Sequence, residues 1–272
     1  MMIIGNKNLD TENNTYVMGI LNVTPDSFSD GGNYNQLDKA LFHTKEMIEE
    51  GADIIDVGGE STRPGYTLIS DDEEIERVCP VIEAIKKEFD IPVSIDTYKG
   101  GVAKAAVISG ADLINDIWGF KHDDMIAKVA AQYNVACCLM HNRNLEINPY
   151  TDYIEDVLND LRESIDIAIK AGVAKEKIIT DPGVGFAKDY TQNLLITKHV
   201  GRLRELGYPV LLGTSRKSMI GLTLDLPASE RVEGTVATSV IGVMNGCSFV
   251  RVHDVKENKR AILMAKAIID VK

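Results

Sequence analysis

The chain has 272 residues, of which 44% are hydrophobic and 26% are charged, a composition typical of folded globular proteins. Its 41 acidic and 29 basic residues give a net charge of −12, which argues against a general nucleic-acid surface and against binding to anionic membranes. No apolar run approaches the roughly 18 residues that a membrane span needs, and the N-terminus has only four apolar residues before Gly5, too few for a signal peptide. We therefore expect a cytoplasmic protein, in which a few local cations could still hold a small anionic substrate.

Predicted strands and helices alternate along the whole chain. Eight short apolar runs rich in β-branched residues are predicted as strands: 16–21, 54–57, 92–95, 113–117, 135–140, 177–180, 209–212 and 248–252. Each is followed by a pattern of helical period, and the predicted helices are 37–50, 71–89, 100–109, 123–132, 153–171, 190–206, 229–245 and 255–269. The strand runs are continuous rather than alternating, which is typical of parallel strands covered on both faces.

This succession predicts an α/β protein with a single-domain (β/α)8 barrel over residues 16–272. The alternative is an open, doubly wound sheet, which also alternates strands and helices. The count of eight favours the barrel, and no GxGxxG motif follows the first predicted strand. Residues 1–15 form a polar N-terminal extension that either caps the barrel bottom or frays, and the sequence leaves both possibilities open.

Polar side chains follow the predicted strands at the end where barrel enzymes hold their active sites. Asp96, Asn115 and Asp181 supply carboxylate and amide groups, which suit the donor-rich edge of a nitrogen heterocycle. The alternative for Asp96 and Asp181 is that each caps the helix that follows, because aspartate favours that position. Several acids within one ring of strand ends favour a binding site over capping.

Cationic groups gather after the last two predicted strands, where this fold commonly binds phosphate. These are Lys217, Arg251 and His253, and Arg63 adds a further cation after the second strand. The alternative for Arg251 is a structural salt bridge to a nearby acid such as Asp254. His141 also follows a strand, but no partner at metal-ligand spacing accompanies it.

The loop after the first predicted strand runs from Asn22 to Gly32 and is rich in hydroxyls and carboxylates, with Phe28 as its single aromatic residue. Polar loops of this kind usually contact a ligand. The amide oxygen of Asn22 suits Mg²⁺, which keeps water ligands and depends on substrate phosphates.

Seven motifs together resemble the dihydropteroate synthases of folate biosynthesis, a family of pterin-binding enzymes. They are MGILNVTPDSFSDGG (18–32), GGESTRPG (58–65), SIDTYK (94–99), INDIWG (114–119), DPGVGFAK (181–188), SRKSMIG (215–221) and RVHDV (251–255). The resemblance extends from about residue 16 to the C-terminal helix.

The resemblance implies condensation of 7,8-dihydropterin-6-ylmethyl diphosphate with 4-aminobenzoate, giving 7,8-dihydropteroate and diphosphate, with Mg²⁺ as cofactor. The implied pterin-binding residues are Asp96, Asn115, Ile117, Met140, Asp181, Phe186, Gly213 and Lys217. The implied diphosphate-binding residues are Asn22, Arg63, Arg251 and His253, with the metal held at Asn22. The implied aminobenzoate-binding residues are Phe28, Thr62, Pro64 and Ser218, and the implied catalytic residues are Asp96, Lys217, Arg251 and Asn22. The family is usually dimeric, so a homodimer is expected.

The chain departs from the family pattern at two places. After the fifth predicted strand the family commonly reads MHM-x-G-x-P, whereas this chain has Met140 to Leu145 as MHNRNL, which affects the conformation of that loop. DPGxGFGK becomes DPGVGFAK, and we expect ordinary backbone angles at Ala187, which replaces the glycine.

Two other functions remain as alternatives. A methyltetrahydrofolate-binding methyltransferase that works with a cobalamin protein would need the pterin-binding acids but no diphosphate site. Arg63, Arg251 and His253 therefore argue against it. A non-catalytic binding module would have lost at least one site residue, and all are present in this sequence.

Overall fold

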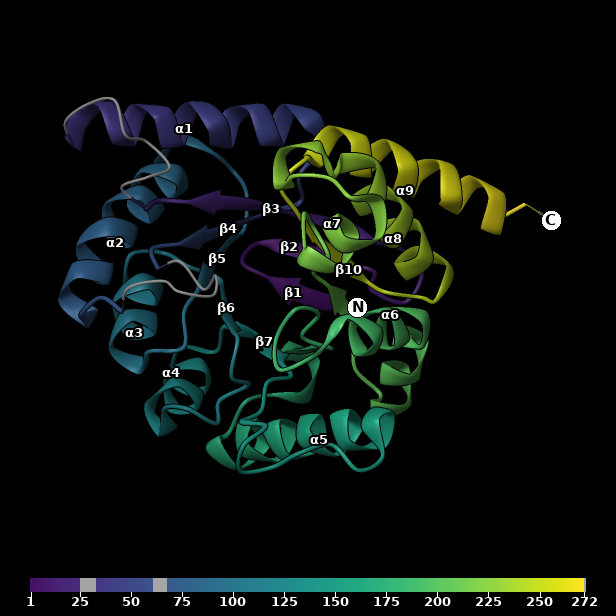
Figure 1. Ribbon diagram of the computed structural model, residues 1–272. Helices are drawn as coiled ribbons and strands as arrows, with labels where there is room; N and C mark the ends of the chain where they lie inside the picture. The colour runs from purple at the N-terminus through teal and green to yellow at the C-terminus, as the bar shows by residue number, and fades with distance from the viewer. Residues whose placement is uncertain (25–32, 61–67, 272) are drawn as a thin grey trace.

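The computed structural model describes residues 1–24, 33–60 and 68–271, and its described core is a barrel of parallel strands (Figure 1). The barrel strands are β3 (Tyr16–Asn22), β4 (Ile54–Gly58), β5 (Val93–Asp96), β6 (Leu113–Asp116), β7 (Ala136–Met140), β8 (Ile178–Asp181), β9 (Leu211–Leu212) and β10 (Phe249–Val252). Their order is β8-β7-β6-β5-β4-β3-β10-β9, and every pair in it is parallel. A parallel bridge between Thr180 and Val210 joins the two ends, so the predicted barrel is confirmed and the open sheet is wrong.

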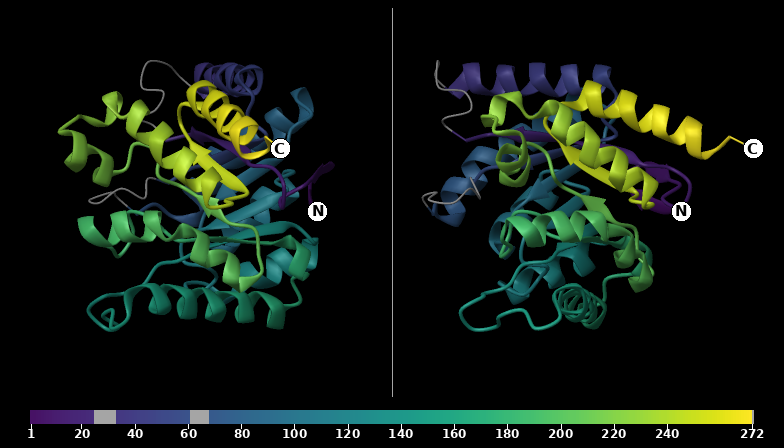
Figure 2. Two further views of the ribbon diagram at one scale, coloured as in Figure 1. Left: turned by 90° about the vertical axis from the view of Figure 1, so that its right-hand side faces the viewer. Right: turned by 45° about the vertical axis from the view of Figure 1, so that its right-hand side comes forward.

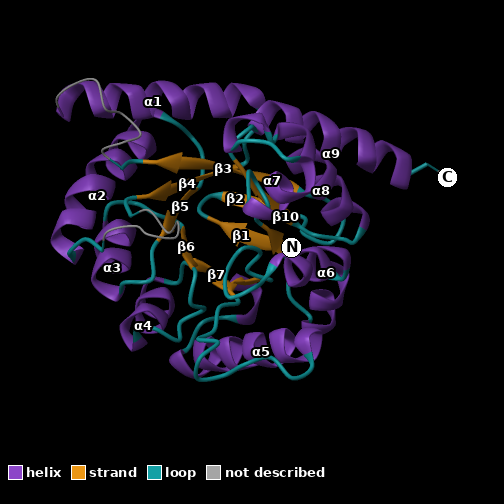
Figure 3. Ribbon diagram, viewed as in Figure 1, coloured by secondary structure: helices purple, strands orange, loops and turns teal. Residues whose placement is uncertain are grey.

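Helices surround the strands on the outside (Figure 3). They are α1 (Asn33–Glu50), α2 (Asp71–Glu88), α3 (Gly100–Ile108), α4 (Asp124–Tyr133), α5 (Tyr153–Ala171), α6 (Tyr190–Lys198), α7 (Ser218–Leu224), α8 (Val232–Met244) and α9 (Val255–Ile269). Most agree with the predicted ranges within a few residues. None among the described residues has the length and apolar character of a membrane-crossing helix.

Two helical predictions were incomplete. The predicted helix 190–206 is divided into α6 and a 3-10 helix, Val200–Leu206, with His199 between them. The short helix α7 was not predicted, because seven residues in a site loop are too few to establish a helical period. Gly221 lies within α7 directly against the Arg231 guanidinium, which packs where a side chain would otherwise stand.

The N-terminal extension closes the bottom of the barrel. Strands β1 (Met2–Ile4) and β2 (Lys7–Leu9) form an antiparallel hairpin, and its buried Met2, Ile4 and Leu9 pack into the same apolar cluster as Phe249. Burial of these side chains removes them from water and fixes the hairpin. The capping alternative is therefore confirmed, although the boundary between residues 15 and 16 stays a prediction. Figure 2 shows both termini at this end of the barrel, which leaves the carboxyl ends of the strands for the site.

Candidate active site

The register of the barrel brings the predicted acceptors together at the carboxyl ends of neighbouring strands. Asn22 pairs with Gly58, Gly58 with Asp96, and Asp96 with Asn115. Two strands further on, Asp181 ends β8 opposite Met140. The sequence prediction that these residues share one end of the barrel is therefore confirmed.

Two glycines lie beside the polar groups. A side-chain carbon built on Gly58 would lie 3.7 Å from the Asn22 Oδ1 atom and 3.9 Å from the Asp96 Oδ2 atom. One built on Gly213 would lie 3.7 Å from Asp181 Oδ2. Gly58, which ends β4, and Gly213, which follows β9, are therefore in van der Waals range of the carboxylate and amide oxygens of the site.

Arg251 lies between two carboxylates. Its Nε donates to Asp56 Oδ2 at 2.6 Å, and its Nη2 donates to Asp96 Oδ2 at 2.6 Å. The alternative of a salt bridge from Arg251 to a nearby acid is confirmed, but its partners are Asp56 and Asp96, because Asp254 is paired with Arg216 instead. The positive charge of Arg251 therefore faces into the barrel, among the predicted site residues.

Asp56 contacts the predicted site residues and was missed by the sequence analysis. It lies in the middle of β4, is completely buried, and accepts from both Arg251 and the Asn115 Nδ2 atom, the latter at 3.4 Å. Its Oδ1 atom has no hydrogen-bond partner within the described structure. An acid inside an otherwise apolar strand is costly to bury, and that cost was the signal in the sequence.

Burial raises the pKa values of three carboxyl groups at this end of the barrel. Desolvation raises the pKa of Asp96 to about 7, opposed by Arg251 and assisted by the neighbouring charge of Asp56. Desolvation also raises the pKa of Asp181 to about 6, opposed by its hydrogen bond from the Gly183 backbone N–H. Asp116, whose pKa rises to about 7 by desolvation, accepts from backbone amides of its own loop and has a structural role. Strongly shifted groups gathered at strand ends are typical of functional sites.

Neither Asp96 nor Asp181 caps a helix. Helix α3 begins after Lys99, and helix α6 is capped by the Asp189 side chain. Asp181 does accept from Gly183 N at 2.6 Å, which tightens its own loop and leaves its second carboxyl oxygen beside Gly213. The capping alternative is therefore wrong for both residues.

An apolar slot borders these polar groups. The buried Tyr98, Ile117 and Met140 form one cluster, against which the half-buried Trp118 and Phe186 pack. The Lys217 ammonium lies 4.4 Å from the centre of the Phe186 ring, a cation–π contact that links the loops after β8 and β9. Tyr98 was not predicted, because a single aromatic residue after a strand end carries no distinctive pattern.

His253 and Ser218 lie on the loops after β10 and β9. The His253 Nδ1 atom is 2.9 Å from Ser215 Oγ, and Ser215 Oγ also accepts from the His253 backbone N–H. Ser218 is the first residue of α7. Both positions are at the same end of the barrel as Arg251.

Four predicted residues lie outside the described residues. They are Phe28, Arg63, Thr62 and Pro64. Their assigned roles stay predictions.

The prediction of ordinary backbone angles at Ala187 is wrong. Ala187 has φ of 46°, in the left-handed region that disfavours residues with a side chain. This conformation costs about 1–2 kcal/mol, which explains why glycine is common at that position in the family pattern. The hydrogen bonds of the neighbouring residues hold Ala187 in this conformation.

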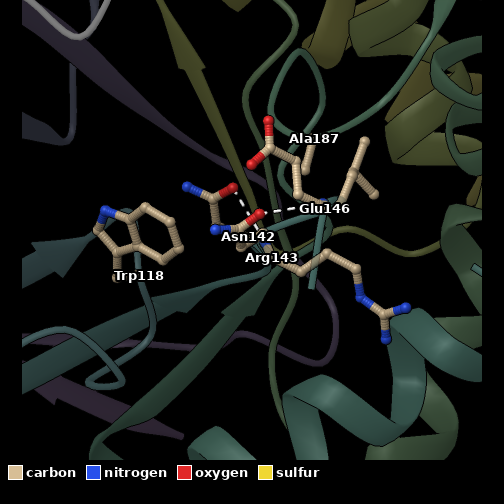
Figure 4. A pocket seen from close by; sticks show the side chains of 7 residues that line it. Trp118, Asn142, Arg143, Glu146 and Ala187 are labelled. Carbon is tan, nitrogen blue, oxygen red and sulfur yellow. Dashed lines mark hydrogen bonds between the residues drawn. The ribbon is translucent and has the colours of Figure 1, made fainter. Parts of the chain in front are cut away.

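The divergent loop after β7 is organised by Arg143. Its Nε donates to Asp160 Oδ2 on α5 at 2.8 Å, and its guanidinium lies 4.6 Å from the Tyr150 ring centre. A cavity of about 460 Å³ opens beside this loop and is lined by Trp118, Asn142, Arg143, Asn144, Leu145, Glu146 and Ala187. Figure 4 shows the Arg143 side chain extending away from Trp118, so the loop is held from its outer side.

The residues at the carboxyl ends of the strands fit a magnesium ion that also binds a phosphate. Among the described residues no cluster of three or more His, Cys, Asp or Glu side chains could enclose a metal. Mg²⁺ needs no such cage, since it commonly takes one or two protein oxygens together with water and phosphate. Asn22 Oδ1 and Asp96 Oδ2 both lie near Gly58 and are hard oxygens of this kind.

Comparisons with known proteins agree with this geometry. The model of the family "Pterin binding enzyme" matches residues 18–253. The dihydropteroate synthase of Clostridium beijerinckii is 63% identical over 269 residues, which cover 98% of this chain and 99% of that protein. A Clostridium difficile dihydropteroate synthase crystallised in the presence of pteroic acid superposes with a TM-score of 0.92 at 50% identity, covering 96% of this chain and 99% of that one. The Xanthomonas albilineans dihydropteroate synthase with 4-aminobenzoic acid gives a TM-score of 0.90 at 41% identity, covering 96% and 95%. The chain therefore belongs to the pterin-binding enzyme family and, within it, to the dihydropteroate synthases.

Proposed function

We propose that this chain condenses 7,8-dihydropterin-6-ylmethyl diphosphate with 4-aminobenzoate to give 7,8-dihydropteroate and diphosphate, a step of folate biosynthesis. One observation carries the proposal: carboxylate acceptors and a guanidinium meet at the carboxyl ends of the strands, beside an apolar slot. The acceptors suit a pterin and the cation suits a diphosphate. The sequence relatives support the same activity.

The pterin ring binds in the slot between the acceptors and the aromatic side chains. Asp96, Asn115 and Asp181 accept hydrogen bonds from its amino and ring N–H groups, which a carboxylate can take in pairs. Lys217 donates to a ring oxygen or nitrogen from above Phe186. Ile117, Met140, Phe186 and Gly213 line the faces of the ring.

The diphosphate binds among Asn22, Arg63, Arg251 and His253. Arg251 keeps its Nε contact with Asp56 while its Nη2 group leaves Asp96 for the diphosphate, so Asp56 holds the arginine in place. Asn22 would hold Mg²⁺, which would supply charge neutralisation for the leaving diphosphate.

The aminobenzoate binds nearest the loops after β3, β4 and β9. Phe28, Thr62 and Pro64 enclose its ring, and the Ser218 hydroxyl meets its polar end. Closure of these loops around the second substrate keeps water from competing with the amine.

The reaction breaks the C–O bond between the pterin methylene and the diphosphate before the new bond forms. Both electrons leave with the diphosphate oxygen, whose growing charge Arg251 and His253 stabilise. The carboxylate of Asp96 stabilises the cationic methylene that remains. The aminobenzoate nitrogen then donates its lone pair to that carbon and loses one proton, which leaves with the diphosphate.

A coupled assay for diphosphate release tests the function. With Mg²⁺ present, purified protein should release diphosphate only when the pterin diphosphate and 4-aminobenzoate are supplied together. Release without aminobenzoate would contradict an ordered substitution, and no release at all would favour a binding module. Calorimetry adds a second measure, since aminobenzoate should bind well only after diphosphate or the pterin substrate is bound.

The chain functions as a homodimer in the cytoplasm. Helices α8 and α9 expose a group of apolar side chains that includes Met244 and Met264, exposed by 70% and 61%. Such patches on a soluble protein commonly mark an interface. Met264→Asp should shift sedimentation toward the monomer, whereas Ile108→Asp on α3, at an equally exposed residue, should not. A wild-type chain that sediments as a monomer at every concentration would contradict the dimer.

A further inference from the structure

Lys188 ends the DPGVGFAK motif and connects the loops after β7 and β8. Its Nζ atom lies 2.8 Å from His141 Nδ1, 3.0 Å from the Gly183 carbonyl oxygen and 2.9 Å from the Phe186 carbonyl oxygen. The imidazole of His141 is completely buried, and its Nε2 atom lies 3.0 Å from Asp160 Oδ2 on α5. The three side chains and two carbonyls form a continuous hydrogen-bonded network from α5 to Phe186.

The hydrogen-bond partners within this network determine which of its atoms carry protons. Asp160 can only accept, since the His141 and Arg143 contacts hold the pKa of its carboxyl group well below the usual value despite desolvation. The His141 Nε2 atom therefore carries the proton, and its Nδ1 lone pair accepts from Lys188. Burial lowers the pKa of Lys188 to about 7, but three acceptors around one nitrogen favour the ammonium form, because a neutral amine has only two hydrogens.

The ammonium group fixes the part of the loop that borders the pterin slot. Lys188 donates to the backbone carbonyl of Phe186, and the ring of Phe186 makes the cation–π contact with the Lys217 ammonium. It also holds the carbonyl of Gly183, whose backbone N–H donates to Asp181. On the other side of the same loop, the Gly185 backbone N–H donates to Asn193 Oδ1 at 2.6 Å.

The two loops are in direct contact at this point. A side-chain carbon on Gly183 would lie 1.9 Å from the His141 carbonyl oxygen, so no other residue fits there without movement. Because all three ammonium hydrogens are engaged, Lys188 has none left for a substrate. Its effect on the reaction must therefore act through the residues that it holds.

We propose that Lys188, oriented by His141 and Asp160, is a positioning residue that sets Phe186 and Asp181 at the correct distance for the pterin ring. This inference rests on the proposed function. It assigns pterin affinity, rather than aminobenzoate affinity or general folding, to a lysine that does not touch substrate.

Lys188→Met tests the proposal, because methionine keeps the length of the side chain and removes its three donors. Lys198→Met is the matched control, since Lys198 is exposed on α6. The KM for the pterin diphosphate should rise by about tenfold in Lys188→Met, the loss that one charge-assisted hydrogen bond produces. The KM for aminobenzoate should stay within about twofold, and the control should match the wild type.

Trp118 gives a second measurement, because it is the single tryptophan of the chain and packs in the same cluster as Phe186. Its fluorescence should respond to the pterin diphosphate at about tenfold higher concentration in Lys188→Met. Lys188→Gln, which can still donate to one or two acceptors, should give an intermediate shift. An unchanged pterin KM, an equal rise of both KM values, or failure of both variants to fold would overturn the proposal. An inactive wild type would instead refute the proposed function.

Discussion

Asp56→Asn tests whether the buried acid that sequence analysis missed serves the reaction. The guanidinium of Arg251 faces two carboxyl groups, Asp56 and Asp96, so the described group carries one surplus negative charge once Asp96, whose pKa is raised to about 7, is ionised. Asparagine keeps the shape of the side chain and an acceptor oxygen, but it removes that charge. The change therefore weakens the hold on Arg251 without leaving a cavity.

The expected effects on activity and on stability have opposite signs. Replacing a charge-assisted hydrogen bond by a neutral one weakens the interaction between residue 56 and Arg251 by about 1.5 kcal/mol. This loss corresponds to about a tenfold decrease in kcat/KM. Stability should increase, because Asp56 is completely buried, its Oδ1 atom has no partner among the described residues, and Asp96 still balances Arg251. The neighbouring charge of Asp56 also raises the pKa of Asp96, so its removal should lower that pKa.

Steady-state kinetics as a function of pH, together with urea unfolding, measure these effects. Asp53→Asn is the control: Asp53 precedes the same strand at the opposite end of the barrel, where it accepts from Val17 N and from Lys259. The control should lower the free energy of unfolding by about 1 kcal/mol and leave kcat/KM unchanged. An unchanged kcat/KM in Asp56→Asn, or an equal loss in both variants, would refute the role of Asp56.

Three further predictions concern the same end of the barrel. Ala187→Gly should raise the free energy of unfolding by about 1 kcal/mol, because relief of the left-handed strain exceeds the added freedom of the unfolded chain; Ala105→Gly in α3 should lower it, and a loss in both would contradict the backbone assignment. Lys217→Ala should abolish pterin binding by calorimetry as well as turnover, and an unchanged affinity would contradict its role. Asp96 and Asp181 have raised pKa values in the folded protein, so their protonated forms stabilise the fold. This stabilisation is fully present below pH 3.8, the ordinary pKa of aspartate, and is lost as the pH rises through about 6 to 7. Pterin affinity needs the ionised acceptors and should rise over that same pH interval. If the free energy of unfolding and the pterin affinity measured by calorimetry changed in the same direction with pH, this assignment would be contradicted.

The sequence determined the barrel and the positions of most site residues. Continuous apolar runs separated by helical periods allow few arrangements, and the carboxyl ends of parallel strands necessarily share one face. Asn22, Asp96, Asn115 and Asp181 could therefore be assigned to that face from their places in the chain alone.

Only the tertiary structure decided which of these groups meet. The partners of Arg251 lie 195 and 155 residues away in the chain, and no local pattern selects Asp56 and Asp96 over Asp254. The left-handed conformation of Ala187 likewise follows from the hydrogen bonds of its loop, which override the preference of alanine. Spacing along the chain shows which end of a strand a residue occupies, whereas burial and closure of the barrel determine which charges must compensate one another.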